Sequence, residues 1–273
     1  MIHVLHAEDG AWPPSAAATE TRLALLRLVA ARTNGAYPSV RDLDFELRLR
    51  EATLDAARAL NGSGAGFETF EHSRCNPEYW RREPNGAFRL RDDRRPSAAL
   101  RDIYENGPMY GFECATAIVI VFYKAALETI GDAAYDRLFA HTYLFHWNVD
   151  RDLGLTTIPA TRFVPGDCLY FDNPDVNPET MQWQGENVIY MGGDSYYGHG
   201  IGIRPAHAII EKLNAHRIPG SIRSAYLLPQ TTRPDYVKLS QSAPHATPPY
   251  VTDGFGLPGL PYRARIGGGA YWF

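Results

Sequence analysis

Apolar residues recur with the helical period of about 3.6 in three stretches near the beginning of the chain. Residues 21–35 carry leucine and valine on one face and end in Asn-Gly, which commonly stops a helix. Residues 39–64 begin at Ser39, a good N-terminal cap, and end in a second Asn-Gly. Residues 95–107 form a shorter segment with Pro96 near its start. The pattern predicts three helices in this part of the chain.

The longest apolar run is Ala115–Tyr123, which has nine residues. Its β-branched residues would allow a strand, but Lys124 and Glu128 lie four residues apart and the stretch continues to Gly131. A helix that begins at Cys114 and is buried on most sides is the better interpretation. The run is too short to cross a bilayer, so no membrane partner is expected.

After residue 160 the pattern changes to short β-rich stretches bounded by glycine, proline, aspartate or asparagine. Four strands of an antiparallel sheet are predicted, over 165–173, 185–193, 199–205 and 221–229. An amphipathic helix opens at Pro205, before the last of these strands. Helices first and strands later indicate an α+β fold rather than a doubly wound one.

Residues 233–273 contain six prolines and six glycines, a composition that does not easily build a core. We expect a Pro/Gly-rich C-terminal arm that lies on the main domain or is partly disordered. Residues 1–232 are predicted to form one domain, helical over 1–131 and sheet-rich over 160–232.

The chain of 273 residues is 45% hydrophobic and 21% charged, which is typical of a soluble globular protein. Its net charge of −4 shows no excess of positive charge of the kind that binds nucleic acid, so no nucleic-acid partner is expected. The N-terminus lacks a basic segment followed by an apolar core, so we expect no secretory signal and synthesis in the cytoplasm. Three cysteines without CxxC spacing predict neither a disulfide framework nor a metal site.

Cys114 stands where a Gly/Pro-rich turn becomes the apolar helix. Unpaired backbone N–H groups and the positive end of the helix dipole would favour its thiolate, and the same N–H groups would hold an oxyanion. The alternative is a small buried hydrophobic residue, the usual fate of a free cysteine. Cys75 and Cys168 are interpreted as structural, because no base lies near them in the sequence.

A cysteine at a helix N-terminus followed by an antiparallel sheet resembles the layout of papain-like enzymes. In cell-wall peptidases of that type, a strand that begins Pro-Gly-Asp precedes the strand with the catalytic base, and the next strand carries a third polar residue. That order assigns the base to Glu186 and the third position to His199. A carboxylate serves as base only if burial raises its pKa toward neutrality. The alternatives are a surface charge for Glu186 and a hydrogen-bonded core histidine for His199.

Four blocks closely resemble the bacterial spore-coat type of protein-glutamine γ-glutamyltransferase, a transglutaminase. They read ENGPMYGFECATAIVIVFY, FVPGDCLYFDNP, QWQGENVIYMGGDSYYGHGIGI and IRSAYLLPQTTR, and the likeness spans residues 40–233. The resemblance implies a calcium-independent enzyme with a papain-like core, a central helix that carries the cysteine and packs on an antiparallel sheet. It also implies an isopeptide cross-link between a glutamine side chain and a lysine ε-amine, without a cofactor, at the spore surface.

The resemblance also assigns roles to individual residues. Cys114 aligns with the nucleophile and Glu186 with the catalytic glutamate. Glu113 aligns with a second acid, next to the cysteine, that substitutes in part. His199 aligns with the histidine of the family's HG-[IL]-GI block. Candidate residues for the substrate passage are Trp183, Asn187, Trp147, Phe67, Phe70 and Tyr110.

Under this interpretation, residues 1–232 are a single catalytic domain whose partners are proteins that bear glutamine and lysine. Transfer to an amine rather than to water requires a dry, narrow channel. A papain-like amidase, deamidase or cell-wall peptidase that uses water as acceptor is the first alternative. The second is an inactive scaffold whose C-terminal arm binds a partner. The oligomeric state is left open.

Overall fold

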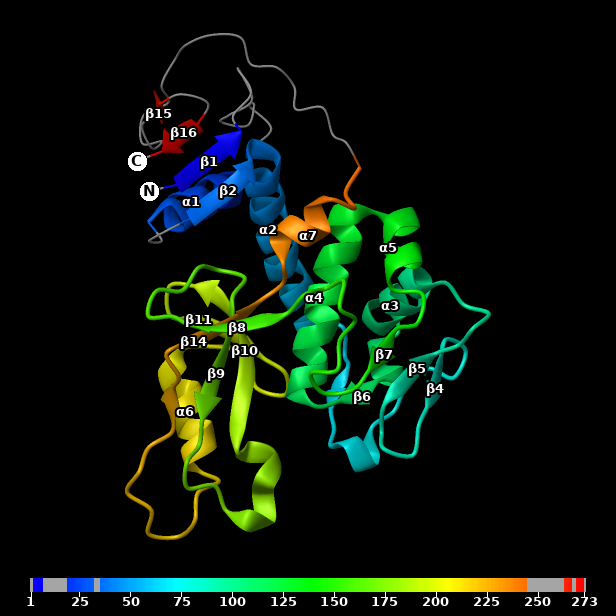
Figure 1. Cartoon of the computed structure of the whole chain (residues 1–273). Helices are drawn as coiled ribbons and strands as arrows, with labels where there is room; N and C mark the ends of the chain where they lie inside the picture. The colour runs from blue at the N-terminus through cyan, green and yellow to red at the C-terminus, as the bar shows by residue number, and fades with distance from the viewer. Residues whose placement is uncertain (1, 7–18, 32–34, 245–262, 267–268, 273) are drawn as a thin grey trace.

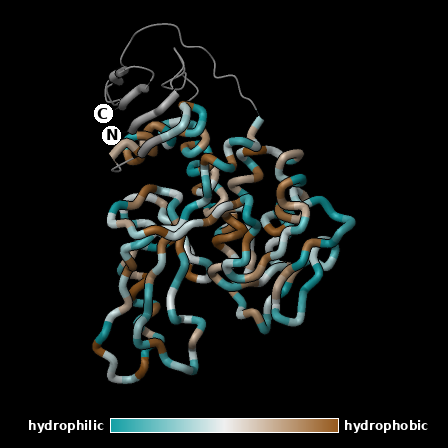
Figure 2. Tube along the Cα trace, viewed as in Figure 1, coloured by the Kyte–Doolittle hydropathy of each residue, from teal (hydrophilic) through white to brown (hydrophobic). Residues whose placement is uncertain are grey.

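The computed structural model describes residues 2–6, 19–31, 35–244, 263–266 and 269–272. Its centre is helix α4 (Cys114–Ile130), which packs against both helix α2 (Val40–Gly62) and an antiparallel sheet (Figure 1). The hydropathy colouring of Figure 2 shows hydrophobic residues gathered along α4. The apolar run is helical, and nearly every side chain of α4 is buried. The prediction of a helix buried on most sides is therefore confirmed.

The central sheet has the strand order β12-β11-β10-β9-β14-β8, and every pairing is antiparallel. In that order the strands span Gly202–Arg204, Ser195–Gly198, Gly185–Gly192, Cys168–Asp172, Gln230–Arg233 and Thr156–Pro159. A short strand, β13 (Tyr226–Leu227), also pairs with β9. The expected α+β fold, with the cysteine helix packed on an antiparallel sheet, is confirmed.

The two faces of the sheet bury different side chains. Cys168 on β9 and Ile189 on β10 belong to the core around α4. Phe171 and Val188, which have the opposite parity on the same strands, pack with Ile209 of helix α6 (Ala206–Asn214). Strand alternation therefore decides which side chains of β9 and β10 face the beginning of α4.

The predicted helix over 21–35 is too long. Helix α1 runs Glu20–Ala30, and the chain re-enters the structure at β2 (Gly35–Ser39). Residues before a proline disfavour the helical conformation, and Pro38 lies in this strand. Strand β2 pairs in parallel with β1 (Ile2–His6), a pairing that no local pattern reveals.

The other elements of the helical part precede or follow α4 in the chain. Helix α2 is capped by Ser39, whose hydroxyl accepts from the Asp42 N–H at 3.2 Å, as predicted. Strand β3 (Gly66–Phe67) pairs with β6 (Gly111–Phe112), which directly precedes α4. The remaining elements of this part are η1 (Phe70–His72), β4 (Trp80–Arg82), β5 (Phe88–Leu90), α3 (Pro96–Glu105), η2 (Gly107–Met109), α5 (Asp132–Leu138) and β7 (Tyr143–Leu144).

The segment after residue 232 contributes regular structure. Helix α7 (Tyr236–Ser240) packs on α2, where the Ser240 hydroxyl donates to Asp42 at 2.5 Å. Strands β15 (Arg263–Ile266) and β16 (Gly269–Trp272) form a hairpin that pairs with β1. The boundary after residue 232 stays a prediction, and most of the expected arm, residues 245–262, lies outside the described residues.

A buried ionic cluster joins helix α2 to the central sheet. Asp167, which precedes β9, accepts from Arg50 of α2 at 2.9 Å and from Arg233 of β14 at 2.7 Å. Arg50 also donates to Glu46 at 2.8 Å. Despite burial, these cations lower the pKa of Asp167. The Pro-Gly-Asp motif therefore anchors the start of β9 to the helical layer.

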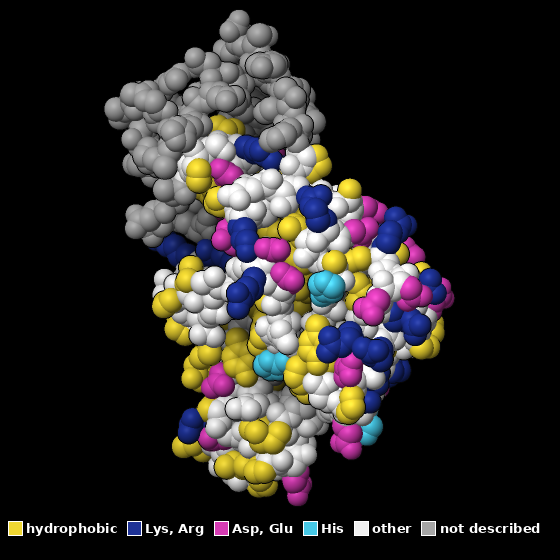
Figure 3. All heavy atoms as spheres, turned by 45° about the vertical axis from the view of Figure 1, so that its right-hand side comes forward, with side chains coloured by type: hydrophobic (Ala, Val, Ile, Leu, Met, Phe, Trp, Pro, Cys, Tyr) yellow, Lys and Arg dark blue, Asp and Glu magenta, His cyan; other side chains and the backbone are white. Residues whose placement is uncertain are grey.

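Charged side chains of both signs are interspersed on the face shown in Figure 3, which agrees with the small net charge. Among the described residues, no helix has both the length and the apolar character needed to cross a membrane.

Candidate active site

The beginning of α4 holds Cys114, which is 9% exposed. Glu113 caps the helix: its carboxylate accepts from the N–H groups of Ala115 at 2.6 Å and Thr116 at 2.7 Å. The Thr116 hydroxyl also donates to it at 2.7 Å. The expectation of unpaired N–H groups beside the thiol is therefore wrong for these two amides, because an acidic N-cap satisfies them.

The thiol of Cys114 lies against strand β10. The side-chain amide of Asn187 donates to its sulfur at 3.4 Å. Burial raises the pKa of Cys114, and the negative charges of Glu186 and Glu113 raise it further, whereas the hydrogen bonds from Asn187 lower it. The resting group is therefore the neutral thiol, not the thiolate that the helix dipole alone predicts.

Glu186 precedes Asn187 on β10 and is 1% exposed. Burial raises its pKa, the charge of Glu113 adds to the effect, and a hydrogen bond from the backbone of His199 opposes it. Its Oε1 atom has no hydrogen-bond partner among the described residues. A carboxyl group in this setting keeps its proton to a higher pH than usual, as an acid–base catalyst near neutrality must.

Gly198 provides the space for this carboxyl group. A Cβ atom at position 198 would lie 2.8 Å from Oε1 of Glu186 and 3.1 Å from its Cγ. We expect Gly198→Ala to displace the Glu186 side chain and to lower the rate of the reaction by on the order of tenfold to a hundredfold, because small misplacements of reacting groups are costly. Kinetics of the purified variant provide the measurement, with Gly62→Ala as a control of less than twofold effect on the rate, since a Cβ atom there meets nothing within 4 Å. An unchanged rate for Gly198→Ala would show that the position of Glu186 does not matter.

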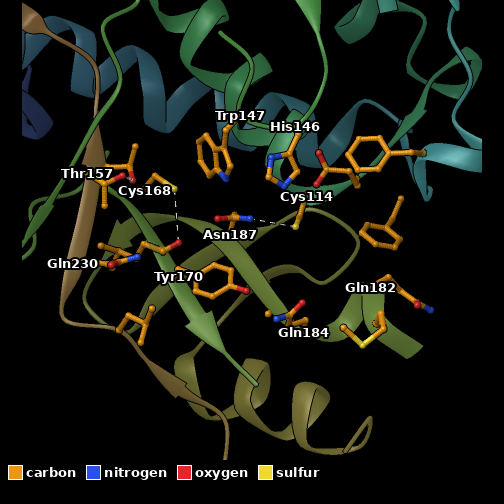
Figure 4. A pocket seen from close by; sticks show the side chains of 18 of the residues that line it. Cys114, His146, Trp147, Thr157, Cys168, Tyr170, Gln182, Gln184, Asn187 and Gln230 are labelled. Carbon is orange, nitrogen blue, oxygen red and sulfur yellow. Dashed lines mark hydrogen bonds between the residues drawn. The ribbon is translucent and has the colours of Figure 1, made fainter. Parts of the chain in front are cut away.

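A cavity of about 560 Å³ opens in front of Cys114. Figure 4 shows Asn187 and Tyr170 on the sheet side of the thiol, with His146 and Trp147 on the opposite side. Six of the residues proposed from the sequence line this cavity: Cys114, Glu113, Asn187, Trp147, Phe67 and Phe70. The structure thus brings together residues from α4, the sheet and two loops.

Four residues proposed from the sequence lie outside the lining. Glu186 and His199 are buried behind it. Trp183 stacks on His216 at 4.5 Å and on Phe67 at 6.0 Å, so it supports the wall from behind.

Tyr110, which the sequence assigns to the substrate passage, does not line this cavity. Tyr110 is fully buried, and its hydroxyl donates to Asp102, which also accepts from Asn76 at 2.9 Å. Closeness to Cys114 in the sequence does not place it in the cavity wall, because its side chain packs into the core around α4.

Several lining residues were not proposed from the sequence. His146 has a positive φ of 51°, unusual for a residue other than glycine, and its N–H donates to the Thr116 hydroxyl at 3.0 Å. This bond ties the loop of His146 to the cap of α4. Tyr170, one of the aromatic residues near the motif blocks that could form a channel wall, lines the cavity and shares the parity of Cys168 on β9.

The ring of His199 is held inside the protein. Its Nε2 donates to the Gly66 carbonyl, 3.0 Å away, so its Nδ1 accepts from the Tyr197 hydroxyl at 3.2 Å. Phe112 stacks on the ring at 4.7 Å. The ring is thus fixed in one tautomer. His199 interacts with Glu186 through a backbone hydrogen bond and not through the ring.

This environment predicts a pH-dependent stability. Burial lowers the pKa of His199 to about 4, below its value in the unfolded chain, so the unfolded state takes up a proton first as the pH falls. The contribution of His199 to the free energy of unfolding should be fully present above about pH 6.5. It should decrease by about 2 kcal/mol between pH 7 and pH 5. Urea unfolding at both values should show a smaller loss for His199→Gln than for the wild type; an equal loss would contradict the assignment.

The other two cysteines have environments that suppress ionisation. Cys168 lines the cavity, but burial and the charge of Asp167 raise its pKa. Burial raises the pKa of Cys75 to about 12. No group of three or more potential metal ligands occurs within the described ranges.

A cysteine at the beginning of a central helix, facing an antiparallel sheet with a buried carboxyl group nearby, defines a papain-like cysteine enzyme of the acyl-transfer or hydrolase class. The family model described as protein-glutamine gamma-glutamyltransferase matches residues 5–243, so the chain belongs to this family.

Bacterial relatives agree with this assignment. A protein-glutamine gamma-glutamyltransferase of Bacillus pumilus (strain SAFR-032) is 49% identical over 222 residues, which cover 81% of this chain and 90% of the relative. The enzyme of the same name from Halalkalibacterium halodurans is 46% identical and covers 72% of this chain and 69% of its own length. The solved structure titled transglutaminase from Geobacillus stearothermophilus (without C-terminal extension) has a TM-score of 0.74 and 51% identity, covering 77% of this chain and 100% of its own.

Proposed function

We propose that this chain transfers the acyl group of a protein glutamine to a lysine ε-amine through a thioester on Cys114, with release of ammonia. The observation that carries the proposal is the pairing of a cavity-facing thiol with the buried carboxyl group of Glu186, whose charge acts on it. Family membership supports the same chemistry.

The pair of Cys114 and Glu186 is suited to a shared proton. Both groups are buried, and the charge of Glu186 raises the pKa of Cys114, so loss of one proton leaves a single negative charge on the pair. The reactive form is the thiolate of Cys114 beside the protonated Glu186. Two hydrogen bonds from Asn187 favour the charge on the sulfur.

Acylation then proceeds with balanced proton transfers. The thiolate attacks the carboxamide carbon, a carbon–sulfur bond forms, and the electron pair of the carbonyl moves to its oxygen. As this pair returns, the carbon–nitrogen bond breaks, and the nitrogen takes the proton of Glu186 and leaves as ammonia. Glu186 is now a carboxylate beside the thioester.

Deacylation uses the same group in reverse. A lysine amine, unperturbed pKa ~10.4, must first lose its proton to solvent. The neutral amine attacks the thioester while Glu186 removes a proton from its nitrogen, and the thiolate of Cys114 leaves. The cycle ends in the state in which it began, and it uses the raised pKa of Glu186 in both directions.

Glu113 supports this chemistry in another way. Its carboxylate accepts three hydrogen bonds from the first turn of α4, so it is held as an acceptor and as the cap of the helix. We assign the main acid–base role to Glu186 and a lesser role to Glu113. Phe67, Phe70 and Trp147 form an apolar wall that limits competition by water.

The proposal extends to activity without calcium on protein substrates that bear glutamine and lysine, and to action at the spore coat. Relationship to enzymes of Bacillus species supports the last point.

The test is an amine-incorporation assay on the wild type with a calcium chelator present. We expect a labelled primary amine to become attached to a glutamine-containing protein, with ammonia released in proportion. Ammonia release that is independent of the amine, without incorporation, would identify a hydrolase instead. Neither activity, together with no labelling of Cys114 by iodoacetamide in the folded protein, would identify an inactive scaffold.

A further inference from the structure

The oxygen that becomes negative during acylation needs hydrogen-bond donors about 2.7–3.1 Å away. In a helix that begins with the nucleophile, the first backbone N–H groups normally serve. Here the carboxylate of Glu113 already accepts from the N–H groups of Ala115 and Thr116. Of the first three amides of the helix, only that of Cys114 is left without an acceptor among the described residues, so further donors for the oxyanion must come from another part of the cavity.

The sheet offers two donors directly across from the thiol. Asn187 on β10 and Tyr170 on β9 are register partners, so their side chains stand side by side on the same face. The Asn187 amide already contacts the sulfur of Cys114 at 3.4 Å. Figure 4 shows the Tyr170 ring below Asn187, with its hydroxyl directed into the cavity.

The hydroxyl of Tyr170 is available. No hydrogen bond from it to any described residue occurs, although the ring is half-buried in the cavity wall. Gly185 makes room for it, since a Cβ atom there would lie 2.1 Å from the hydroxyl oxygen. The strand that carries Glu186 and Asn187 thus begins with a glycine that lets the phenol lie over the start of the strand, at the cavity wall.

We propose that the Tyr170 hydroxyl and the Asn187 side-chain amide together bind the oxyanion of the tetrahedral intermediate. The role rests on the proposed function, because only attack on a carbonyl group creates this oxyanion. When the carbon–sulfur bond forms, the carbonyl electron pair settles on the oxygen and both donors bind it; when the carbon–nitrogen bond breaks, the pair returns. Neither donor gives up its proton.

The environment of Tyr170 keeps it a donor. Burial raises its pKa to about 12, and the charges of Asp172, Cys114 and Glu186 act in the same direction. The phenol therefore keeps its proton at the pH of the reaction. A group that donates throughout the reaction, without being ionised, is the kind that a preorganised oxyanion site requires.

The test is the variant Tyr170→Phe, which removes only the hydroxyl. We expect kcat for ammonia release from a glutamine donor to decrease by on the order of a hundredfold, with little change in KM. Alkylation of Cys114 by iodoacetamide displaces iodide at a saturated carbon and forms no oxyanion, so its rate should change less than twofold. Asn187→Ala should slow both reactions, because it also removes a donor to the sulfur.

A matched control is Tyr190→Phe, whose hydroxyl donates to Gly193 at 3.1 Å in the hairpin after β10 and should leave both rates unchanged. Unchanged kcat in Tyr170→Phe, with an active wild type, would overturn the assignment. An equal decrease in alkylation would also overturn it, since Tyr170 would then act on the sulfur. A wild type that alkylates but releases no ammonia would instead refute the proposed function.

Discussion

Replacing Cys114 by alanine is expected to abolish amine incorporation, with a loss on the order of 10⁴-fold or more. The thiol is the one group that the proposed thioester cannot do without, and of the two cysteines that line the cavity Cys114 is the one whose sulfur accepts from a side-chain amide. The thiol is small and nearly buried, so alanine should preserve the fold. Incorporation of a labelled amine into a glutamine-containing protein measures the loss, and circular dichroism checks the fold.

The matched control is Cys75→Ala. Cys75 lies outside the cavity, and burial raises its pKa to about 12. Its removal should leave incorporation within twofold of the wild type. Activity retained by a folded Cys114→Ala variant would exclude the thioester route.

The second large effect is expected for Glu186→Gln, which keeps the size of the side chain but cannot exchange a proton. Incorporation should decrease by on the order of 10²- to 10⁴-fold, because both half-reactions use this group. Acylation should lose its acid and deacylation its base, so the burst of ammonia and the steady-state rate should both decrease. Stopped-flow ammonia detection followed by the amine assay separates the two steps.

Glu113→Gln is the comparison that decides between the two acids. Its amide oxygen still accepts from the first turn of α4, so the variant should lose less activity than Glu186→Gln. It should also lose about 1 kcal/mol of stability, because the charged cap is replaced by a neutral one. If Glu113→Gln were inactive and Glu186→Gln fully active, the assignment of the acid–base group would be reversed.

The sequence predicted the centre of the fold because that part is governed by local rules. The run from Cys114 to Ile130 is long and apolar, and it stops at Gly131, whose φ of 80° few other residues adopt. The cap of α2 at Ser39 follows equally from local chemistry. Such elements are readable before any tertiary contact is known.

Long-range pairings were not readable. Strands β1 and β16 come from opposite ends of the chain, and no local pattern joins them. The strand predicted over 199–205 is instead a turn followed by the short β12, because Gly200 and Gly202 have φ values of 89° and 86°. Strand β11, which comes before that turn, was missed for the same reason.

For the site, the sequence predicted which residues take part better than it predicted the environment of each residue. Cys114 and Asn187 lie where the motif blocks place them, but the occupation of the helix amides by Glu113 depends on a side-chain conformation. The raised pKa of the thiol follows from burial together with two nearby acids, which only the three-dimensional arrangement reveals. Tyr110 does not line the cavity, because neighbouring residues in a chain can face different layers of the structure.

The most direct measurement is the mass of the intermediate. The wild type, incubated with a glutamine-containing peptide and no amine, is quenched in acid and digested. The peptide that contains Cys114 should gain the mass of the donor less that of ammonia, and added amine should remove the gain. Acyl label on any other residue, or its absence from Cys114 while amine incorporation proceeds, would contradict the account.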